Sequence, residues 1–490
     1  MNRIGIDPER AIGTIDRNIF GGFAEHLGRC IYGGIYEPGS PLADKNGFRT
    51  DVLNALKQLN IAVVRYPGGN FASGYRWRDG VGPVSERPAR TDLAWNNVET
   101  NHFGTNEFIE FCHKLKTEPY LVVNCGDGDM REAQDWVEYC NGTRDTALVK
   151  LRGEHGYPKP HGVKYWGIGN EVDGHWQIGY KTPEEYARAF TEFGKVMKWV
   201  DPNIKLIASA ISDWKGSLVE RTRLLLEQAG DLIDYLSLHW YVGNATADFA
   251  AYMAVSELLE ERLSVYEGLV RAVSFERQIK RPIYIAVDEW NVWYRTYPEE
   301  VREKTKLEEI YNLEDALVTA IQLNAFIRHA RLVKMANIAQ IVNVIAPVFT
   351  RPDGFVLQTI FYPFELYSRT CGNLALDPWW EGDTFSGGIY KGVRTLDVSA
   401  TLHETNKQVI LYVVNRSGSQ ITETSIQLTN GEFTGKVSAF VINAPDIKAE
   451  NTFKSPNATQ IKESKHEARG HALEYTFEPH SVTALVCSIS

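Results

Sequence analysis

The chain has 490 residues, a length that fits a barrel with an accessory domain better than one small domain. Hydrophobic residues make up 43% of it and charged residues 23%, which is ordinary for a globular protein with a large core. Its 62 acidic residues outnumber its 52 basic ones, and the net charge of −10 argues against a nucleic-acid partner, because binding phosphates requires a basic surface.

Cysteine usage and the N-terminal residues indicate where the protein acts. The six cysteines form no CxxC pair, and in a chain of this length we expect reduced thiols in a cytoplasmic protein. The first residues lack the apolar segment of a signal peptide, and no run approaches the roughly 20 apolar residues of a membrane span. We therefore expect an intracellular protein, without membrane contact, that acts on a molecule small enough to be imported.

Short apolar runs alternate with longer helical patterns from about residue 18 to residue 372. In chain order the predicted strands are 19–23, 61–66, 120–124, 163–168, 205–209, 235–239, 283–287 and a last one within 333–344. Near-continuous apolar runs are typical of parallel strands that are buried on both faces. Eight such strands alternating with helices predict an α/β fold of the (β/α)8 or TIM barrel type.

Two of the intervening helices have clear signals. Thr182-Pro183-Glu184-Glu185 combines an N-cap, a proline at the first helical position and two acids in the first turn. This segment predicts a helix that runs to about Val200, before Pro202. A second helix is predicted over 313–330.

After about residue 373 the pattern changes to alternating apolar and polar residues separated by turn residues. Strands are predicted over 408–414, 425–428, 437–442 and 481–486. This pattern is typical of an antiparallel β-sandwich, to which the extended-looking residues 1–17 would add a strand. The predicted division is a catalytic barrel over 18–372 and a jelly-roll-like sandwich domain over 1–17 plus 373–490. The polar stretch 448–469 is the candidate for a mobile loop.

Two glutamates stand at the ends of the fourth and seventh predicted strands. Glu171 ends the segment Gly169-Asn170-Glu171, and Glu289 lies in Asp288-Glu289-Trp290-Asn291. Functional residues of a (β/α)8 barrel lie at the carboxyl ends of its strands. Hydrolysis of a glycosidic bond needs two carboxyl groups, one to protonate the leaving oxygen and one to attack the anomeric carbon or activate water. One such glutamate would more often be a structural acid, but the pair predicts a glycoside hydrolase.

These two strand ends resemble the acid/base and nucleophile segments of the clan A barrel glycosidases. Further segments narrow the resemblance to the α-L-arabinofuranosidases of glycoside hydrolase family 51, over about residues 15–370. They are Gly21–Arg29, Arg65–Phe71, Trp77–Pro83, Asp92–Trp95, Ser237–Tyr241 and Ala336–Pro347. The resemblance is weaker, and mostly architectural, in the sandwich.

The resemblance implies a retaining, exo-acting α-L-arabinofuranosidase of arabinan catabolism. It would release terminal α-L-arabinofuranosyl residues from arabino-oligosaccharides or arabinoxylan fragments by double displacement. Glu171 would be the general acid/base and Glu289 the nucleophile, with carboxyl groups about 5–5.5 Å apart. Glu171 must then start protonated and Glu289 ionised. Arg65 is the candidate to fix the charged Glu289, with a purely structural ion pair as the alternative.

The resemblance also implies a set of residues that bind the arabinofuranose or shape its pocket. They are Glu25, Asn70, Asn170, Gln340, Tyr241, His239, Trp95 and Trp293. Within this set Tyr241 is expected to hold Glu289 in place, and the two tryptophans to form pocket walls. The structural alternatives are a salt bridge for Glu25, a turn for Asn70, a core amide bonded to the backbone for Gln340, and core packing for His239 and the tryptophans.

The sequence differs from the family pattern at three places. Asp127 and Asp129 follow the third strand, where a neutral turn is expected. Trp240 replaces an expected polar residue, and the segment after Tyr294 is short, ending in Tyr297–Glu300. These differences leave the chemistry intact and the preference for the leaving group open.

Several alternatives stay open at this point. The same scaffold serves β-D-galactofuranosidases, β-xylosidases and endo-β-glucanases, and a non-catalytic sugar-binding protein is a further reading. We expect no cofactor and no metal, because the chain has no P-loop, no GxGxxG after a strand, no HExxH and no zinc-ligand spacing. The expected partner is a small oligosaccharide, and the resemblance implies a homo-oligomer, a hexamer.

Overall fold

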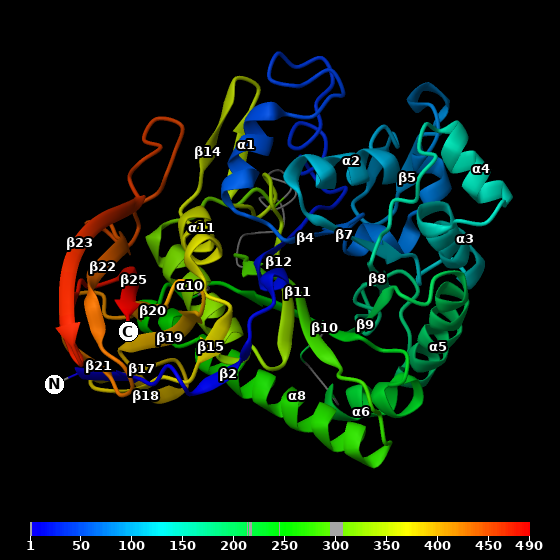
Figure 1. The fold of residues 1–490 in the computed structure, drawn as a ribbon. Coiled ribbons are helices and arrows are strands. Elements are labelled where there is room, and N and C mark those ends of the chain that lie inside the picture. Colours follow the sequence, from blue (N-terminus) through cyan, green and yellow to red (C-terminus); the bar gives the residue numbers. More distant parts are fainter. Residues whose placement is uncertain (1, 213, 215–217, 245, 295–306) are drawn as a thin grey trace.

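The computed structural model describes residues 2–212, 214, 218–244, 246–294 and 307–490. Eight parallel strands form a closed barrel, and mainly antiparallel sheets built for the most part from the C-terminal residues pack against one side of it (Figure 1). The barrel strands are β3 (Gly21–Phe23), β4 (Val63–Tyr66), β7 (Glu118–Val123), β8 (Tyr165–Ile168), β9 (Lys205–Ile211), β10 (Tyr235–Val242), β11 (Tyr284–Val292) and β12 (Val333–Ala339). The predicted (β/α)8 barrel is confirmed.

Helices connect the barrel strands and lie outside them (Figure 1). They are α1 (Thr50–Gln58), α2 (Thr105–Leu115), α3 (Met130–Asn141), α4 (Ala147–Glu154), α5 (Pro183–Val200), α6 (Leu218–Ala229), α7 (Phe249–Met253), α8 (Ser256–Glu276), α10 (Leu313–Arg328) and α11 (Phe361–Thr370). Helix α5 begins as predicted, because the Thr182 hydroxyl accepts a hydrogen bond from the Glu185 N–H and the Glu185 carboxylate accepts one from the Thr182 N–H. Helix α10 ends two residues before the predicted Ala330. No helix in the described part of the chain is long and apolar enough to cross a bilayer.

Short elements lie in a connection between barrel strands, directly before the first of these strands or after the last one. They are the 3₁₀ helices η1 (Arg17–Phe20), η2 (Asn70–Gly74), η3 (Trp77–Gly80) and η4 (Val84–Glu86), and the hairpins β5 (Arg90–Asp92) with β6 (Asn97–Glu99) and β13 (Val348–Arg351) with β14 (Gly354–Leu357). Most of them belong to the long connection between β4 and β7. This connection therefore supplies much of the surface beside the barrel opening.

The sandwich consists of a seven-stranded and a four-stranded sheet. The first has the order β2-β15-β19-β20-β25-β22-β23 and the second β16-β1-β21-β24. Their strands are β1 (Asn2–Ile6), β2 (Ala11–Thr14), β15 (Leu374–Leu376), β16 (Trp379–Glu381), β19 (Leu396–His403), β20 (Gln408–Asn415), β21 (Thr422–Leu428), β22 (Phe433–Ile442), β23 (Ile461–Gly470), β24 (Ala472–Phe477) and β25 (Ser481–Ile489), beside a hairpin of β17 (Thr384–Gly387) and β18 (Tyr390–Arg394). The N-terminal residues add one strand to each sheet, where one strand in total was expected. We propose 18–372 and 1–17 plus 373–490 as the two domains.

The prediction of a mobile loop over 448–469 is wrong for its second half. Ile461–Gly470 forms β23, which pairs with β22 along its whole length. Most of its side chains are exposed, because β23 is the outermost strand of its sheet. The polar composition that suggested a loop is therefore that of a solvated edge strand.

The barrel and the sandwich share a continuous hydrophobic core on the side of α10 and α11. Tyr367 of α11 stacks on Tyr412 of β20 with ring centroids 4.0 Å apart. A charged cluster crosses the same boundary, where Arg328 of α10 lies 2.6 Å from Glu260 of α8 and 3.1 Å from Asp397 of β19. Burial raises the pKa of Glu260, but the nearby Arg328 and, next, His329 outweigh it and lower this pKa to about 2. The boundary is therefore held by charge pairs as well as by apolar packing.

Replacing Arg328 with methionine should lower the free energy of unfolding by about 3–5 kcal/mol. The reason is that Glu260 and Asp397 would stay in place without the cation they share. Thermal and urea unfolding of the purified protein measure the loss. The matched control is Arg271→Met at an exposed position of α8. Equal stabilities of the two variants would contradict this role of the cluster.

Candidate active site

The residues predicted to bind substrate meet at the carboxyl-terminal end of the barrel. Glu25 follows β3, Arg65 lies on β4, Asn170 and Glu171 follow β8, His239 and Tyr241 lie on β10, Glu289 lies on β11, and Gln340 follows β12. Six of the eight barrel strands thus contribute side chains to one site. Neighbouring strands place some of them side by side, since His239 stands opposite Glu289 in the register of β10 and β11.

Glu171 and Glu289 face each other with His239 between them. The His239 Nδ1 atom lies 2.9 Å from Glu171 Oε1 and 3.4 Å from Glu289 Oε2. A carboxylate oxygen of each glutamate lies within 4.8 Å of the other. The Glu171 side chain is 15% exposed and that of Glu289 is 7% exposed, so solvent screens their charges only weakly.

Arg65 and Tyr241 fix the carboxylate of Glu289. The Arg65 Nη1 atom donates to Glu289 Oε1 at 2.6 Å, and the Tyr241 hydroxyl donates to Glu289 Oε2 at 2.8 Å. The other amino group of Arg65 donates to Asn170 Oδ1 at 2.7 Å. Arg65 therefore does more than form a structural ion pair, because one planar group sets the positions of both Glu289 and Asn170.

Asp288 supports Arg65 from the barrel interior. Its Oδ2 atom lies 3.4 Å from Arg65 Nε and accepts a hydrogen bond of 2.8 Å from the Tyr120 hydroxyl. Burial lowers the pKa of Arg65, but the charges of Asp288 and Glu289 outweigh it and raise this pKa above its usual value. Strict alternation along a strand would point Asp288 and Glu289 to opposite faces. The register of β11 with β12 shifts between Val287 and Trp290, and this bulge lets both acids face inward.

His239 carries a positive charge at neutral pH. Burial alone would lower its pKa, but the carboxylates of Glu289, Glu171 and Asp288 raise it to about 9. The three groups Glu171, His239 and Glu289 have the spacing of a metal site in the described part of the chain. The Nδ1 atom of His239 contacts both carboxylates, so the three groups also hold one another as an ion cluster.

Glu25, Gln340 and Trp95 form a second cluster beside Glu289. Glu25 Oε1 accepts hydrogen bonds from the Trp95 indole at 3.0 Å and from the Phe71 N–H at 3.1 Å. Glu25 Oε2 accepts one from the Gln340 amide at 3.1 Å. Burial and, next, the charge of Glu289 raise the pKa of Glu25 to about 8. A protonated Glu25 at neutral pH can donate a hydrogen bond to a sugar hydroxyl as well as accept one.

Asn70 and Trp293 lie next to these clusters. The Asn170 amide donates to Asn70 Oδ1 at 3.4 Å. Trp293 follows β11, and its ring packs edge-on against Tyr241 with centroids 5.3 Å apart. The structure thus brings every residue of the predicted site to one region of the barrel opening.

Gly68 and Gly69 allow the chain to pass close to two buried acids. A Cβ atom on Gly69 would lie 2.9 Å from Glu289 Oε1, and one on Gly68 would lie 2.6 Å from Glu25 Cγ. Any larger residue would displace a carboxyl group. These two glycines are therefore required by the packing around the site, and they also bring Asn70 next to Asn170.

Nothing in the sequence pattern marks Trp176, which the structure places against Glu171. Its indole donates to Glu171 Oε2 at 2.7 Å while 55% of the residue is exposed. It lies in the loop after β8, away from any strand end or periodic run. The backbone of Glu171 itself is left-handed, with φ of 44°, which is uncommon for a residue with a side chain.

The departures from the family pattern lie in different environments. Asp129 is the N-cap of α3, a structural role. Trp240 is buried against Trp214 on the outer side of β10, with ring centroids 6.0 Å apart, and so points away from the site. Asp127 is exposed at the barrel rim. The segment 297–300 lies outside the described residues.

The stability of the protein should depend on the charge of His239. Its pKa rises from 6.5 in the unfolded chain to about 9 in the folded protein. Its contribution is therefore complete below about pH 6.5 and is lost as the pH rises through about 9. The size of this contribution is on the order of 3 kcal/mol.

Urea unfolding at about pH 6 and about pH 9.5 measures this dependence. Glu25 also has a raised pKa in the folded protein, so its contribution to stability is also lost as the pH rises. The effect of His239 is therefore obtained by comparing the wild type with His239→Gln. The wild type should lose more stability than the variant over this range. Equal losses would show that the His239 proton does not stabilise the fold.

Comparison with known proteins places this chain among sugar hydrolases. A family model described as "Alpha-L-arabinofuranosidase C-terminal domain" matches residues 288–481, and one described as "Alpha-L-arabinofuranosidase 1 domain" matches residues 55–256. Alpha-L-arabinofuranosidase C of Emericella nidulans is 42% identical over 98% of this chain and 96% of its own length. Intracellular exo-alpha-(1->5)-L-arabinofuranosidase 1 of Bacillus subtilis is 38% identical over 98% of this chain and 97% of its own length.

Solved structures show the same similarity. The alpha-L-arabinofuranosidase from Thermotoga maritima, in complex with arabinose, has a TM-score of 0.92 and 38% identity, with all of both chains covered. A family 51 alpha-L-arabinofuranosidase from Bifidobacterium longum has a TM-score of 0.93 and 32% identity, again over all of both chains.

Proposed function

Because this chain belongs to the α-L-arabinofuranosidases of glycoside hydrolase family 51, we propose that it is a retaining exo-enzyme for (1→5)-linked arabino-oligosaccharides. It would release the terminal α-L-arabinofuranosyl residue. The observation that carries the proposal is the close pair of the partly buried Glu171 and the buried Glu289, with carboxylate oxygens within 4.8 Å. The linkage is taken from two relatives whose names specify exo-(1→5) action, from Bacillus subtilis and Halalkalibacterium halodurans.

In the first step Glu289 attacks the anomeric carbon and forms an arabinosyl ester while the glycosidic bond breaks. Glu171 gives its proton to the leaving oxygen in the same step. The hydrogen bonds from Arg65 and Tyr241 support Glu289 as the ionised partner. They leave the carboxylate in a fixed orientation toward the sugar.

In the second step a water molecule attacks the ester and the arabinose leaves with its original configuration. Glu171, now without its proton, accepts one from that water. Its two oxygens accept hydrogen bonds from His239 and Trp176, which orient it for both steps. His239 is a positioning residue here, since its ring nitrogens bind carboxylates rather than substrate.

The short distance between the carboxylates supports retention. Retaining glycosidases have carboxyl groups about 5–5.5 Å apart, whereas inverting enzymes leave roughly 6.5–9.5 Å for a water molecule. A separation within 4.8 Å leaves no room for that water between Glu171 and Glu289.

The polar groups around Glu289 support binding of one furanose ring. Glu25, Asn70, Asn170 and Gln340 present hydrogen-bonding groups in a buried region, as sugar hydroxyls require. The tryptophans at 95 and 293 would form the apolar walls of this pocket, against which a sugar face can pack. No cofactor is needed for this chemistry, since both proton and nucleophile come from side chains.

The wild type should hydrolyse p-nitrophenyl α-L-arabinofuranoside in preference to the β-D-galactofuranoside, β-D-xylopyranoside and β-D-glucopyranoside. Glu289→Ala should lose nearly all turnover on every substrate, because no other group forms the ester. Glu171→Ala should lose about 10²–10⁴-fold with arabinobiose and much less with the aryl arabinofuranoside, whose leaving group needs little protonation. Steady-state kinetics measure all three.

The comparison of the activity losses of the variants on the two substrate types decides between the roles. Equal losses of Glu171→Ala on both substrate types would contradict its role as the acid. Preference for another glycoside would contradict the proposed substrate while leaving the roles of the carboxylates intact. Glu289→Gln, which keeps the shape of the side chain, is the matched control for a structural effect of the alanine variant.

Hydrolysis in the presence of methanol should yield methyl α-L-arabinofuranoside, because methanol can replace water in the second step. Proton NMR of the early products identifies the anomer. Formation of the β anomer would show a single displacement and would remove Glu289 from the role of nucleophile.

We also propose that the protein acts in the cytoplasm as a homo-hexamer. Relatives whose names include "intracellular" support the location. Exposed apolar residues such as Trp199 and Phe275 support contacts between copies. Cell fractionation tests the first proposal, and light scattering tests the second, with an expected mass six times the 55.4 kDa of one chain. A monomer mass would contradict the assembly.

A further inference from the structure

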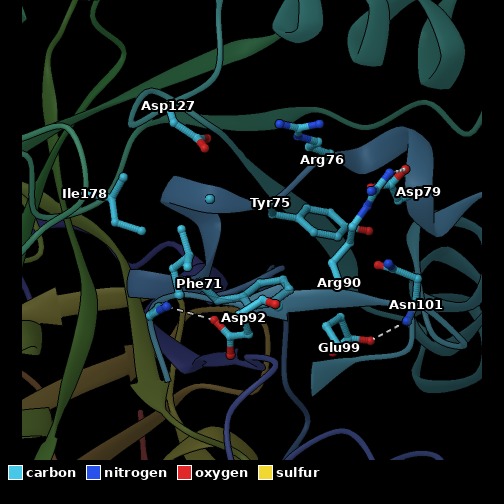
Figure 2. A pocket seen from close by; sticks show the side chains of 14 residues that line it. Phe71, Tyr75, Arg76, Asp79, Arg90, Asp92, Glu99, Asn101, Asp127 and Ile178 are labelled. Carbon is cyan, nitrogen blue, oxygen red and sulfur yellow. Dashed lines mark hydrogen bonds and ion pairs between the residues drawn. The ribbon is translucent and has the colours of Figure 1, made fainter. Parts of the chain in front are cut away.

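A second pocket lies beside the catalytic site, between the loops that follow β4, β7 and β8 (Figure 2). Its volume is about 190 Å³. The side chains that matter for its chemistry are Tyr75, Arg76, Asp79, Arg90, Asn101 and Asp127. None of them belongs to the set that surrounds Glu171 and Glu289.

The pocket shares a wall with the catalytic site. Phe71 lines the pocket, and its N–H donates to Glu25 in the catalytic site. Asp92 also lines it and accepts hydrogen bonds from the N–H groups of Ala94, at 2.9 Å, and Trp95, at 3.3 Å. The indole of Trp95, in the turn that Asp92 holds, donates a hydrogen bond to Glu25 in the catalytic site. The pocket and the arabinosyl site are therefore separated by one layer of residues.

The pocket also lies on the side of the leaving group. Ile178, from the loop after β8, is part of its lining. The same loop carries Trp176, whose indole is bonded to Glu171. Because the general acid contacts the leaving oxygen, the sugar units beyond the cleaved bond must pass this loop. An extended substrate would thus reach the pocket without crossing Glu289.

The lining has the groups that bind an uncharged sugar. Asn101 is 1% exposed, and its Oδ1 atom accepts no hydrogen bond within the described part of the chain. In Figure 2 its amide lies on the pocket side. Arg76 offers donors and Asp127 acceptors along one side of the pocket, and Tyr75 offers a ring face. A buried acceptor without a donor is costly unless a ligand or water supplies one.

The balance of charge in the pocket disfavours acidic sugars. Arg90 is paired with Asp79 at 2.8 Å, so these two charges offset each other. The acids Asp92, Glu99 and Asp127 then remain, with Arg76 as the one further arginine of the described lining. A uronate or a phosphorylated sugar would add negative charge to this surface, whereas a neutral pentose would not.

We propose that this pocket is a subsite for a neutral sugar unit in the leaving group of the same oligosaccharide. This inference rests on the proposed function, and it adds that Arg76 and Asp127 determine the preference for longer substrates. Both side chains are exposed at the rim, where a sugar can reach them. Asp127 is also one of the acids that depart from the expected neutral turn.

The test compares short and long substrates in rim variants. Arg76→Ala and Asp127→Asn should lower kcat/KM about tenfold for (1→5)-arabinotetraose. The same variants should change kcat/KM for p-nitrophenyl α-L-arabinofuranoside by less than about twofold, because its leaving group is too small to reach the pocket. Asp129→Asn is the matched control, since asparagine caps α3 as well as aspartate does and Asp129 does not line the pocket.

A third variant fills the pocket instead of removing a hydrogen bond. A Cβ atom on Gly74 would meet only Ile178 Cδ1, at 3.6 Å, so Gly74→Leu places a new side chain in the cavity without a clash at its base. Gly74→Leu should lower kcat/KM for arabinotetraose as the rim variants do and leave kcat/KM for the aryl arabinofuranoside unchanged. Unchanged kinetics on arabinotetraose in all three variants would overturn the proposal, as would equal losses on both substrates.

Binding distinguishes failure of this proposal from failure of the proposed function. Isothermal titration of Glu289→Ala with arabinotetraose and with arabinose measures affinity without turnover. The subsite is supported if Glu289→Ala binds arabinotetraose more tightly than arabinose and if this difference disappears in the double variant with Asp127→Asn. This result would support the subsite even if hydrolysis follows another route. Equal binding of tetraose and arabinose would overturn the subsite even if the wild type hydrolyses arabinofuranosides as proposed.

Discussion

The active site depends on keeping Glu171 and Glu289 close together in a region nearly closed to water. Within 4.8 Å of each other, the two carboxylates would repel by on the order of 3 kcal/mol or more if both were ionised and the effective dielectric constant were about 20. Arg65 and His239 offset this repulsion, because each places a positive charge within hydrogen-bonding distance of one or both acids. The cations are in turn balanced by Asp288, which contacts Arg65 at 3.4 Å and His239 at 3.6 Å. The catalytic pair is therefore one part of a larger buried ion cluster.

The barrel is the scaffold that makes such a cluster possible. Parallel strands end at the same rim, so acids and cations distant in sequence meet without long loops. The bulge of β11 adds Asp288 to the interior beside Glu289. The glycines at 68 and 69 leave space for the two carboxyl groups at 25 and 289. The sandwich contributes none of these groups, but its shared core with α10 and α11 supports the barrel on one side.

The barrel and the catalytic pair could be predicted from the sequence because both rest on local patterns. Apolar runs identify strands, and a glutamate directly after such a run has only one end of the barrel to occupy. Asp288 could not be assigned in this way, because its inward position depends on a bulge in the pairing of β11 with β12. Trp176 and Asn101 belong to loops, where no strand or helix periodicity marks a residue, so no signal in the sequence indicates their positions beside Glu171 and the second pocket. The edge strand β23 was mistaken for a loop because solvation of its side chains removes the apolar signal.

The residues of the ion cluster lie on the barrel strands or directly after them, whereas the residues proposed to select the leaving group lie on loops. Changing a residue of the ion cluster alters the electrostatic environment of its partners, because Arg65, His239 and the three acids form ion pairs with one another in a region of low dielectric constant. Such positions tolerate little variation in an enzyme that retains its mechanism. Arg76 and Asp127, by contrast, are exposed on loops and contact none of the catalytic carboxylates in the described structure. Differences at these loop positions can therefore alter which leaving groups are accepted while the geometry of Glu171 and Glu289 stays the same.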